Sequence, residues 1–171
     1  MKRQLATIGM AGLLLAVPMV ADEATAESGT KCEARADFTF SPGFFREGST
    51  GTWTTNGETG TVTCDGPVNG KMPTGPGTYG ASGRYGTANP DDCSNAEGDY
   101  QNSITIPTAD GPQRVTNQGP WSAGAFQGGG AFGGTFKGET ADGSFESTPK
   151  EGDCVTKPLT KMDIRLKWTL K

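Results

Sequence analysis

Apolar and polar residues alternate strictly along the end of the chain, over positions 161–171. The apolar members of this segment are Met162, Ile164, Leu166, Trp168 and Leu170. A period of two places them on one face of a β-strand, which is expected to be buried, and leaves the charged residues on the other face. Segment 32–40 has the same pattern, with Cys32, Ala34, Ala36, Phe38 and Phe40 in phase. Two such strands at the ends of one domain are expected to pair and to close a barrel.

Further short segments with strand-like composition lie between these two, separated by turn residues. They cover 50–55, 59–64, 78–86, 99–107, 113–117, 121–127, 131–138 and 144–147. Asn56-Gly57 predicts a hairpin turn. The tetrapeptide Thr-Ala-Asp-Gly at 108–111 and again at 140–143 predicts two hairpin tips, because glycine accepts the positive φ of tight turns. We therefore predict an all-β fold of about 8–10 short strands, a single small antiparallel β-barrel with a β-sandwich as the alternative.

The N-terminus predicts the compartment. Lys2 and Arg3 precede an uncharged apolar run over 5–20, and Ala24-Thr25-Ala26 offers small residues at the positions that signal peptidase reads. The run is shorter than the ~20 residues that span a bilayer, which argues against a retained anchor. We predict a cleaved signal peptide over 1–26, a single β-barrel domain over 27–171, and a secreted product without a membrane association.

Composition makes the core unusual. Residues 27–171 hold ten Val, Ile and Leu residues against fourteen aromatic residues and twenty-five glycines. A chain with so few aliphatic residues must build its core from aromatic rings, and covalent staples are expected to help. The same residues carry 13 Lys and Arg against 17 Asp and Glu, and this mild acidity argues against a nucleic-acid partner.

Four cysteines follow the predicted signal peptide, at Cys32, Cys64, Cys93 and Cys154. An even number in an exported chain predicts two disulfides. Three connectivities are possible, and we favour Cys32–Cys64 with Cys93–Cys154, which staples an N-terminal sheet unit and closes the long second half. A zinc site is the poorer interpretation, because no two cysteines are closely spaced and the chain contains no histidine.

Motifs for cofactors and metals are weak. Segments 75–80 and 128–133 match the G-x-G-x-x-G pattern, but neither follows an apolar parallel strand nor opens a helix, and glycine beside an aromatic ring explains them better. Segment 89–99 gathers oxygen ligands of the kind that hold calcium, although a solvated acidic loop explains it equally well. We predict neither a cofactor nor a metal.

Candidate functional residues are few, because the absence of histidine removes the commonest general base and the usual nucleophilic triads. The candidate binding residues are Tyr79, Arg84, Tyr85, Tyr100 and Trp121, of which the tyrosines and the arginine are placed at a barrel mouth. The competing interpretation is that the tyrosines are core rings with their hydroxyls at the rim. No catalytic residue is predicted.

The exported, glycine- and aromatic-rich layout with end strands in phase resembles that of dirigent and allene oxide cyclase-like barrels, and this resemblance implies a fold rather than an activity. Our first hypothesis is a non-catalytic binding or cell-envelope interaction module whose partner is a small molecule or an extracellular protein. The second is a small enzyme of cyclase or isomerase type that uses tyrosine, arginine and carboxylate groups. The third is an enzyme inhibitor that presents an exposed loop such as 66–77.

Overall fold

A computed structural model describes residues 29–90, 92–125, 128–136 and 139–170. This part of the chain contains nine β-strands and no helix. The strands are β1 (Thr30–Phe44), β2 (Gly51–Thr54), β3 (Gly60–Asp65), β4 (Gly77–Tyr85), β5 (Ala96–Ile106), β6 (Gln113–Ala125), β7 (Gly129–Phe136), β8 (Glu139–Glu151) and β9 (Leu159–Leu170). The segment predicted at 113–117 and the described part of the segment predicted at 121–127, up to Ala125, belong to the single strand β6.

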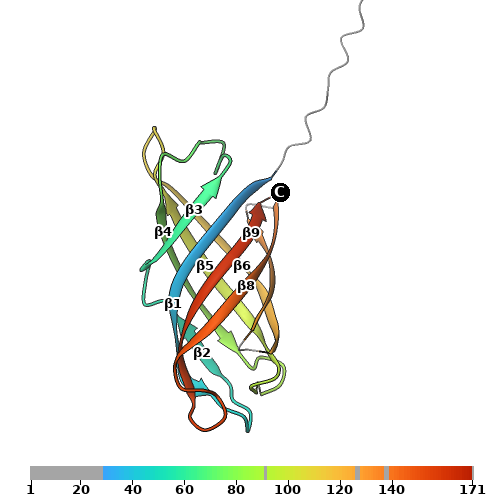
Figure 1. Cartoon of the computed structure of the whole chain (residues 1–171). Helices are drawn as coiled ribbons and strands as arrows, with labels where there is room; N and C mark the ends of the chain where they lie inside the picture. The colour runs from blue at the N-terminus through green and yellow to red at the C-terminus, as the bar shows by residue number, and fades with distance from the viewer. Residues whose placement is uncertain (1–28, 91, 126–127, 137–138, 171) are drawn as a thin grey trace, which may run out of the picture.

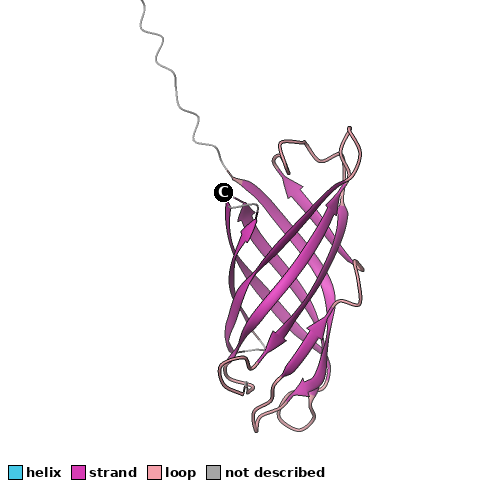
Figure 2. Cartoon of the chain, turned by 180° about the vertical axis from the view of Figure 1, so that it is seen from behind, coloured by secondary structure: helices cyan, strands magenta, loops and turns pink. Residues whose placement is uncertain are grey.

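The strands form one closed antiparallel barrel with eight strand positions, which decides between the barrel and the sandwich (Figures 1 and 2). From β3 to β9 each strand pairs with the next one along the chain, and β1 pairs with β9 to close the sheet. The short strands β2 and β3 share one position, since both lie between β1 and β4. Closure leaves the sheet without an open edge.

The pairing of the two chain-end strands confirms the expectation from alternation. Cys32 lies opposite Trp168 and Ala34 opposite Leu166, and the register continues without a break to Phe38 and Met162. The apolar sets of both strands are buried in the barrel. On the outer face Arg35 Nε lies 3.0 Å from the carboxylate of Asp163. We call the ion-paired outer surface of β1, β8 and β9 the ionic face; its paired residues are Glu33, Arg35, Asp37, Lys150, Glu151, Lys161, Asp163 and Arg165.

Two disulfides staple the barrel at its two ends, with the predicted connectivity. Cys32–Cys64 joins the start of β1 to the end of β3, two strands that are also paired by hydrogen bonds. Cys93–Cys154 lies at the opposite end and joins the β4–β5 loop to the β8–β9 loop. Two intramolecular disulfides are compatible with an oxidising, extracellular environment.

Aromatic rings fill the barrel because glycines make room for them on neighbouring strands. One inward-facing row, read strand by strand, contains Phe40, Trp53, Gly83, Tyr100 and Gly119. A second row contains Tyr85, Gly98, Trp121, Phe132, Gly143 and Trp168. Glycines follow rings at most steps of these rows, so many rings lie over bare backbone, while Phe40 meets Trp53 and Trp121 meets Phe132 directly. This arrangement explains how a chain poor in aliphatic residues forms a closed core.

Two turn predictions are wrong. The strands on either side of Asn56-Gly57, β2 and β3, do not pair with each other but both pair with β1 and β4, so this dipeptide joins two segments of one strand position and is not a hairpin turn. Residues 140–143 lie within β8, where Ala141, Asp142 and Gly143 pair with both β7 and β9. The identical tetrapeptide at 108–111 does form a turn, in which the Gly111 N–H donates to the Thr108 carbonyl. Pairing with two neighbouring strands therefore overrides the local turn preference of the same four residues.

The predicted signal peptide over 1–26 lies outside the described residues. Among the residues that are described, no helix is long and apolar enough to cross a membrane.

Candidate functional site

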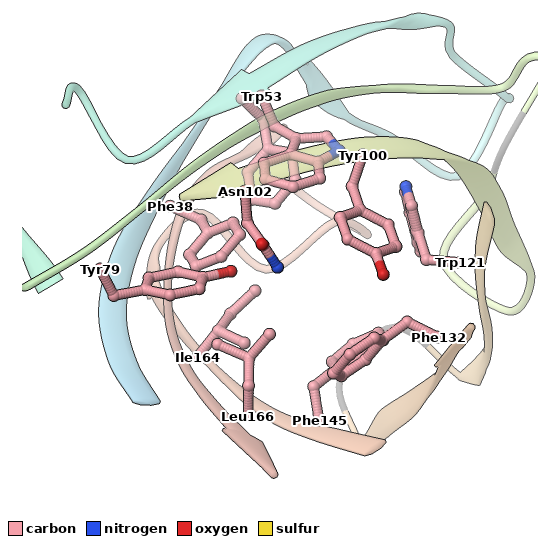
Figure 3. A pocket seen from close by; sticks show the side chains of 11 residues that line it. Phe38, Trp53, Tyr79, Tyr100, Asn102, Trp121, Phe132, Phe145, Ile164 and Leu166 are labelled. Carbon is pink, nitrogen blue, oxygen red and sulfur yellow. The ribbon is translucent and has the colours of Figure 1, made fainter. Parts of the chain in front are cut away.

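Two concave regions share a wall made by β2, β4 and β5. The first is a cavity inside the barrel of about 40 Å³. It is lined by Phe38, Phe40, Trp53, Tyr79, Tyr100, Asn102, Trp121, Phe132, Phe145, Ile164 and Leu166, most of which appear in Figure 3. A space of this size holds roughly two or three water molecules. It is far smaller than the roughly 300–1,000 Å³ that a drug-sized ligand occupies.

A few polar groups reach into this aromatic cavity. Figure 3 shows the Tyr79 hydroxyl and the Asn102 amide directed toward its centre, and these two side chains are hydrogen-bonded. Asn117 Nδ2 donates to the Tyr100 hydroxyl at 3.0 Å. Burial raises the pKa of Tyr100 to about 12 and shifts that of Tyr79 upward as well. Both phenols therefore stay protonated at neutral pH, as hydrogen-bonding groups rather than as bases.

Two buried polar atoms have no hydrogen-bond partner among the described residues: Trp53 Nε1, in a side chain that lines the cavity, and Asn117 Oδ1, in the residue opposite Asn102. Each side chain is more than nine-tenths buried. A buried group of this kind destabilises the fold by about 1–3 kcal/mol unless a small polar molecule satisfies it. The cavity can therefore accommodate water-sized polar molecules.

The second region, which we call the outer hollow, is a depression of about 1090 Å³ on the outside of the barrel. Two outward cross-strand rows form it, one containing Thr39, Thr54, Ser82, Gln101 and Gln118, the other Ser41, Thr52, Arg84, Asp99 and Pro120. Asn56, Gly83, Gly119, Gly134 and the rims of Trp53 and Tyr100 complete it. Eight of its sixteen lining residues carry a serine or threonine hydroxyl or a side-chain amide.

The charged side chains among the described residues of the outer hollow are Arg84 and Asp99, and they pair with each other. Arg84 Nε lies 3.0 and 3.2 Å from the two carboxylate oxygens of Asp99. The hydrogen bond and the negative charge of Asp99 raise the pKa of Arg84 further above its usual range. Both side chains are exposed, and their opposite charges cancel. The ion pair therefore adds hydrogen-bonding groups to the row without adding a net charge.

The predicted binding residues are divided between these regions. Tyr79, Tyr100 and Trp121 line the inner cavity, and Arg84 lines the outer hollow, which Tyr100 also reaches. Tyr85 belongs to neither, since its ring stacks on Phe44 and its hydroxyl donates to the Pro42 carbonyl. Arg84 lies on the outside of the barrel and not at a mouth, because consecutive residues of a strand face opposite sides of the sheet.

Sequence reasoning missed Ser82, Gln101 and Gln118, which lie side by side on three neighbouring strands. They face outward, because Tyr100 and Asn102 on either side of Gln101, and Asn117 beside Gln118, are buried. No local signal shows that they share one row, because the row depends on the register of strands that are distant in sequence.

A third feature is the β3–β4 loop, residues 66–76, at the upper end of the barrel in Figure 1. Val68 is fully buried, and Val68 and Lys71 exchange two backbone hydrogen bonds across Asn69-Gly70, both of which have positive φ. The Thr74 N–H donates to the Pro107 carbonyl at 2.9 Å. Met72 is nevertheless 62% exposed, so the loop is anchored while it presents an apolar side chain.

The remaining candidate motifs have structural explanations. Segments 75–80 and 128–133 lead into the antiparallel strands β4 and β7, and no helix follows either within the described residues. In the acidic loop the Asp92 carboxylate accepts the backbone N–H groups of Ser94 and Asn95, which lower its pKa. Among the described residues, which omit Asp91, no three His, Cys, Asp or Glu side chains gather as metal ligands.

Comparisons of this chain with protein-family models, with curated proteins and with solved structures gave no match.

Proposed function

We propose that this protein is an exported, non-catalytic binding module that uses the outside of its barrel. The observation that carries this proposal is the contrast between the two concave regions. Aromatic rings fill the interior to a cavity of about 40 Å³, whereas the outer hollow measures about 1090 Å³. The barrel then serves as a rigid support, and the outer hollow is one of the outer surfaces that present accessible hydrogen-bonding groups.

Export into an oxidising compartment is part of the proposal. The predicted signal peptide over 1–26 and the two disulfides support it together. A cell-envelope component or an extracellular protein is then the partner class that the module would meet.

The enzyme alternative receives less support from the geometry. A cyclase or isomerase of this fold needs an interior pocket that takes its substrate, with a tyrosine or an acid at the floor. Tyr79 and Tyr100 do lie at the inner cavity, but a substrate of ordinary size would have to displace the rings around them.

Inhibition of an extracellular enzyme is a second candidate function, and the β3–β4 loop favours it. The loop is fixed by the buried Val68, by the hydrogen bond between Thr74 and Pro107 and by the ion pair of Lys71 with Asp110, while Met72 stays exposed. A loop that is already ordered loses little conformational entropy when it enters a cleft, and this preorganisation favours tight binding.

The binding function is tested by cosedimentation of the purified, oxidised protein with cell-envelope fragments from the organism that produces it. Ser82→Arg fills the centre of the outer hollow, and Ser144→Arg makes the same change at an exposed position of β8 outside it. We expect the wild type and the Ser144→Arg variant to sediment with the fragments, and at least tenfold less of the Ser82→Arg variant to do so. Equal sedimentation of both variants would contradict the proposal.

The inhibitor candidate is tested separately with a panel of secreted proteases. We expect inhibition of at least one of them, and at least a tenfold weaker effect for Met72→Asp than for Val155→Asp, which changes the other large exposed apolar side chain among the described residues. Inhibition that is equal in both variants, or absent for the wild type, would remove this candidate.

A further inference from the structure

The outer hollow has an unusual chemistry for a surface of this size. Gln101 and Gln118 face each other on β5 and β6, and Ser82 lies beside Gln101 on β4. Each amide offers two donors and one acceptor, and each hydroxyl offers both functions. The rows continue across β2 and β1 with threonine and serine. The hollow therefore offers uncharged donors and acceptors along both of its rows.

This lining differs from that of the ionic face, which shares only β1 with the outer hollow. There, Lys150 lies between Asp37 and Asp163, and ion pairs follow one another along β1, β8 and β9. In the outer hollow the Arg84–Asp99 pair neutralises itself. An anionic or cationic polymer would therefore gain little there by charge complementarity.

The lining is also unlike the core of a protein–protein interface. Such cores are enriched in aromatic residues, methionine and arginine and depleted in serine, and threonine and serine are rare among their energetic hot spots. The two exposed large apolar side chains of the described residues, Met72 and Val155, lie in end loops and not in the hollow. The aromatic residues of the hollow are Trp53 and Tyr100, and each of them is only 7% exposed.

We infer that the outer hollow binds an uncharged polysaccharide chain, an inference that rests on the proposed binding function. Sugar hydroxyls both donate and accept hydrogen bonds, so they complement a field of amides and hydroxyls without net charge. The planar side chains of Gln101 and Gln118, and the ion pair of Arg84 with Asp99, can each engage two neighbouring hydroxyls at once. The hollow extends over six strands, from β1 to β7, which suits an extended polymer.

The test uses purified, oxidised protein and three insoluble uncharged probes: cellulose, chitin and cross-linked dextran. The binding variant is Gln101→Ala/Gln118→Ala. The matched control is Gln113→Ala, which removes the same kind of side chain from β6 outside the hollow. A second control, Lys150→Ala, removes a cation from the ionic face. Thermal unfolding of every variant checks that the barrel is intact.

We expect the wild type and both controls to be retained on at least one probe. The Gln101→Ala/Gln118→Ala variant should lose at least tenfold in affinity. Retention should change less than twofold between 0.05 and 1 M salt (about the range over which an electrostatic interaction is screened out), because no net charge is involved.

Three results would overturn the inference: no retention on any probe, retention that the double variant keeps, or retention that salt abolishes. Self-association of the protein through the hollow, detected as a dimer by sedimentation equilibrium and broken by Ser82→Arg, would also overturn it by assigning the surface to a second copy. One outcome would reject the ligand class alone. If the protein sediments with cell-envelope fragments in a way that depends on Ser82, but is not retained on any polysaccharide probe, the proposed binding function would still stand.

Discussion

Gly83 lies opposite Trp53 on the neighbouring strand, and the indole ring occupies the space that a side chain would need. A Cβ atom at position 83 would lie 2.6 Å from Cζ2 of Trp53 and 2.1 Å from the carbonyl oxygen of Asp99. Real Cβ atoms do not approach other atoms so closely. A large side chain on one strand is thus accommodated by a glycine on the next strand. Trp53 lines both concave regions and so forms part of the wall between the inner cavity and the outer hollow.

Gly83→Ala is therefore expected to destabilise the protein by about 1–3 kcal/mol, because the strand or the ring must move to admit one methyl group. The measurement is the free energy of unfolding in urea. Gly75→Ala is the matched control, since nothing lies within 4 Å of a Cβ there and the loop backbone needs no positive φ. Gly75→Ala should be neutral or stabilise by up to about 1 kcal/mol. Similar losses in both variants would refute the ring-over-glycine explanation.

The disulfide Cys93–Cys154 is expected to stabilise the barrel more than Cys32–Cys64 does. The bonds close segments of 61 and 32 residues, and the entropy of loop closure predicts ~4.3 and ~3.7 kcal/mol respectively. A hydrogen bond from the Arg46 N–H to the Cys154 carbonyl also ties the β8–β9 loop to the barrel, and within this loop the Asp153 carboxylate accepts the N–H groups of Val155, Thr156 and Lys157. Replacing each pair by alanine and measuring unfolding in guanidinium tests the order.

Limited proteolysis gives an independent check of the same prediction. Loss of Cys93–Cys154 should open cleavage sites in 86–95 and 152–158, whereas loss of Cys32–Cys64 should leave those loops protected, because its two strands stay paired. Equal protection of 86–95 and 152–158 in both variants would mean that these loops do not depend on the Cys93–Cys154 disulfide.

Glu58 is expected to make stability depend on pH. Partial burial alone would raise its pKa, but hydrogen bonds from Thr78, Ser103 and Thr105 and the positive charge of Arg114 together hold the pKa below its usual value. A lowered folded-state pKa means that the stabilisation is complete above the unfolded value of about 4.5 and is lost as the pH falls through the folded value.

Glu58→Gln is then expected to destabilise the protein at pH 7 by about 1.5–3 kcal/mol, the usual range for hydrogen bonds to a charged group. The difference between wild type and variant should shrink as the pH falls from about 5 to about 3. Denaturant unfolding across this range measures it. A difference that stays constant with pH would show that the carboxylate charge contributes nothing.

Tyr100→Phe is expected to destabilise the protein by about 1–3 kcal/mol, because it leaves the buried Nδ2 of Asn117 without its acceptor at 3.0 Å. Tyr100→Phe/Asn117→Leu removes both partners and should recover part of that loss. A double-mutant cycle that includes Asn117→Leu gives the coupling energy, and a coupling near zero would contradict the hydrogen bond.

Local alternation was enough to predict much of this fold. The period of two over 32–40 and 161–171 indicated which side chains face the core, and their position at the two ends of the domain favoured closure by β1 and β9. Cysteine positions favoured the connectivity that the structure shows. These features were accessible because a strand's two faces are encoded within its own few residues.

Tertiary structure alone decided the rest. The tetrapeptide at 140–143 is strand because β7 and β9 pair with it, although its copy at 108–111 turns. Arg84, Asp99, Ser82, Gln101 and Gln118 become one surface only through the registers of β4, β5 and β6. A register is set jointly by all the contacts between two strands, so no short stretch of sequence contains it.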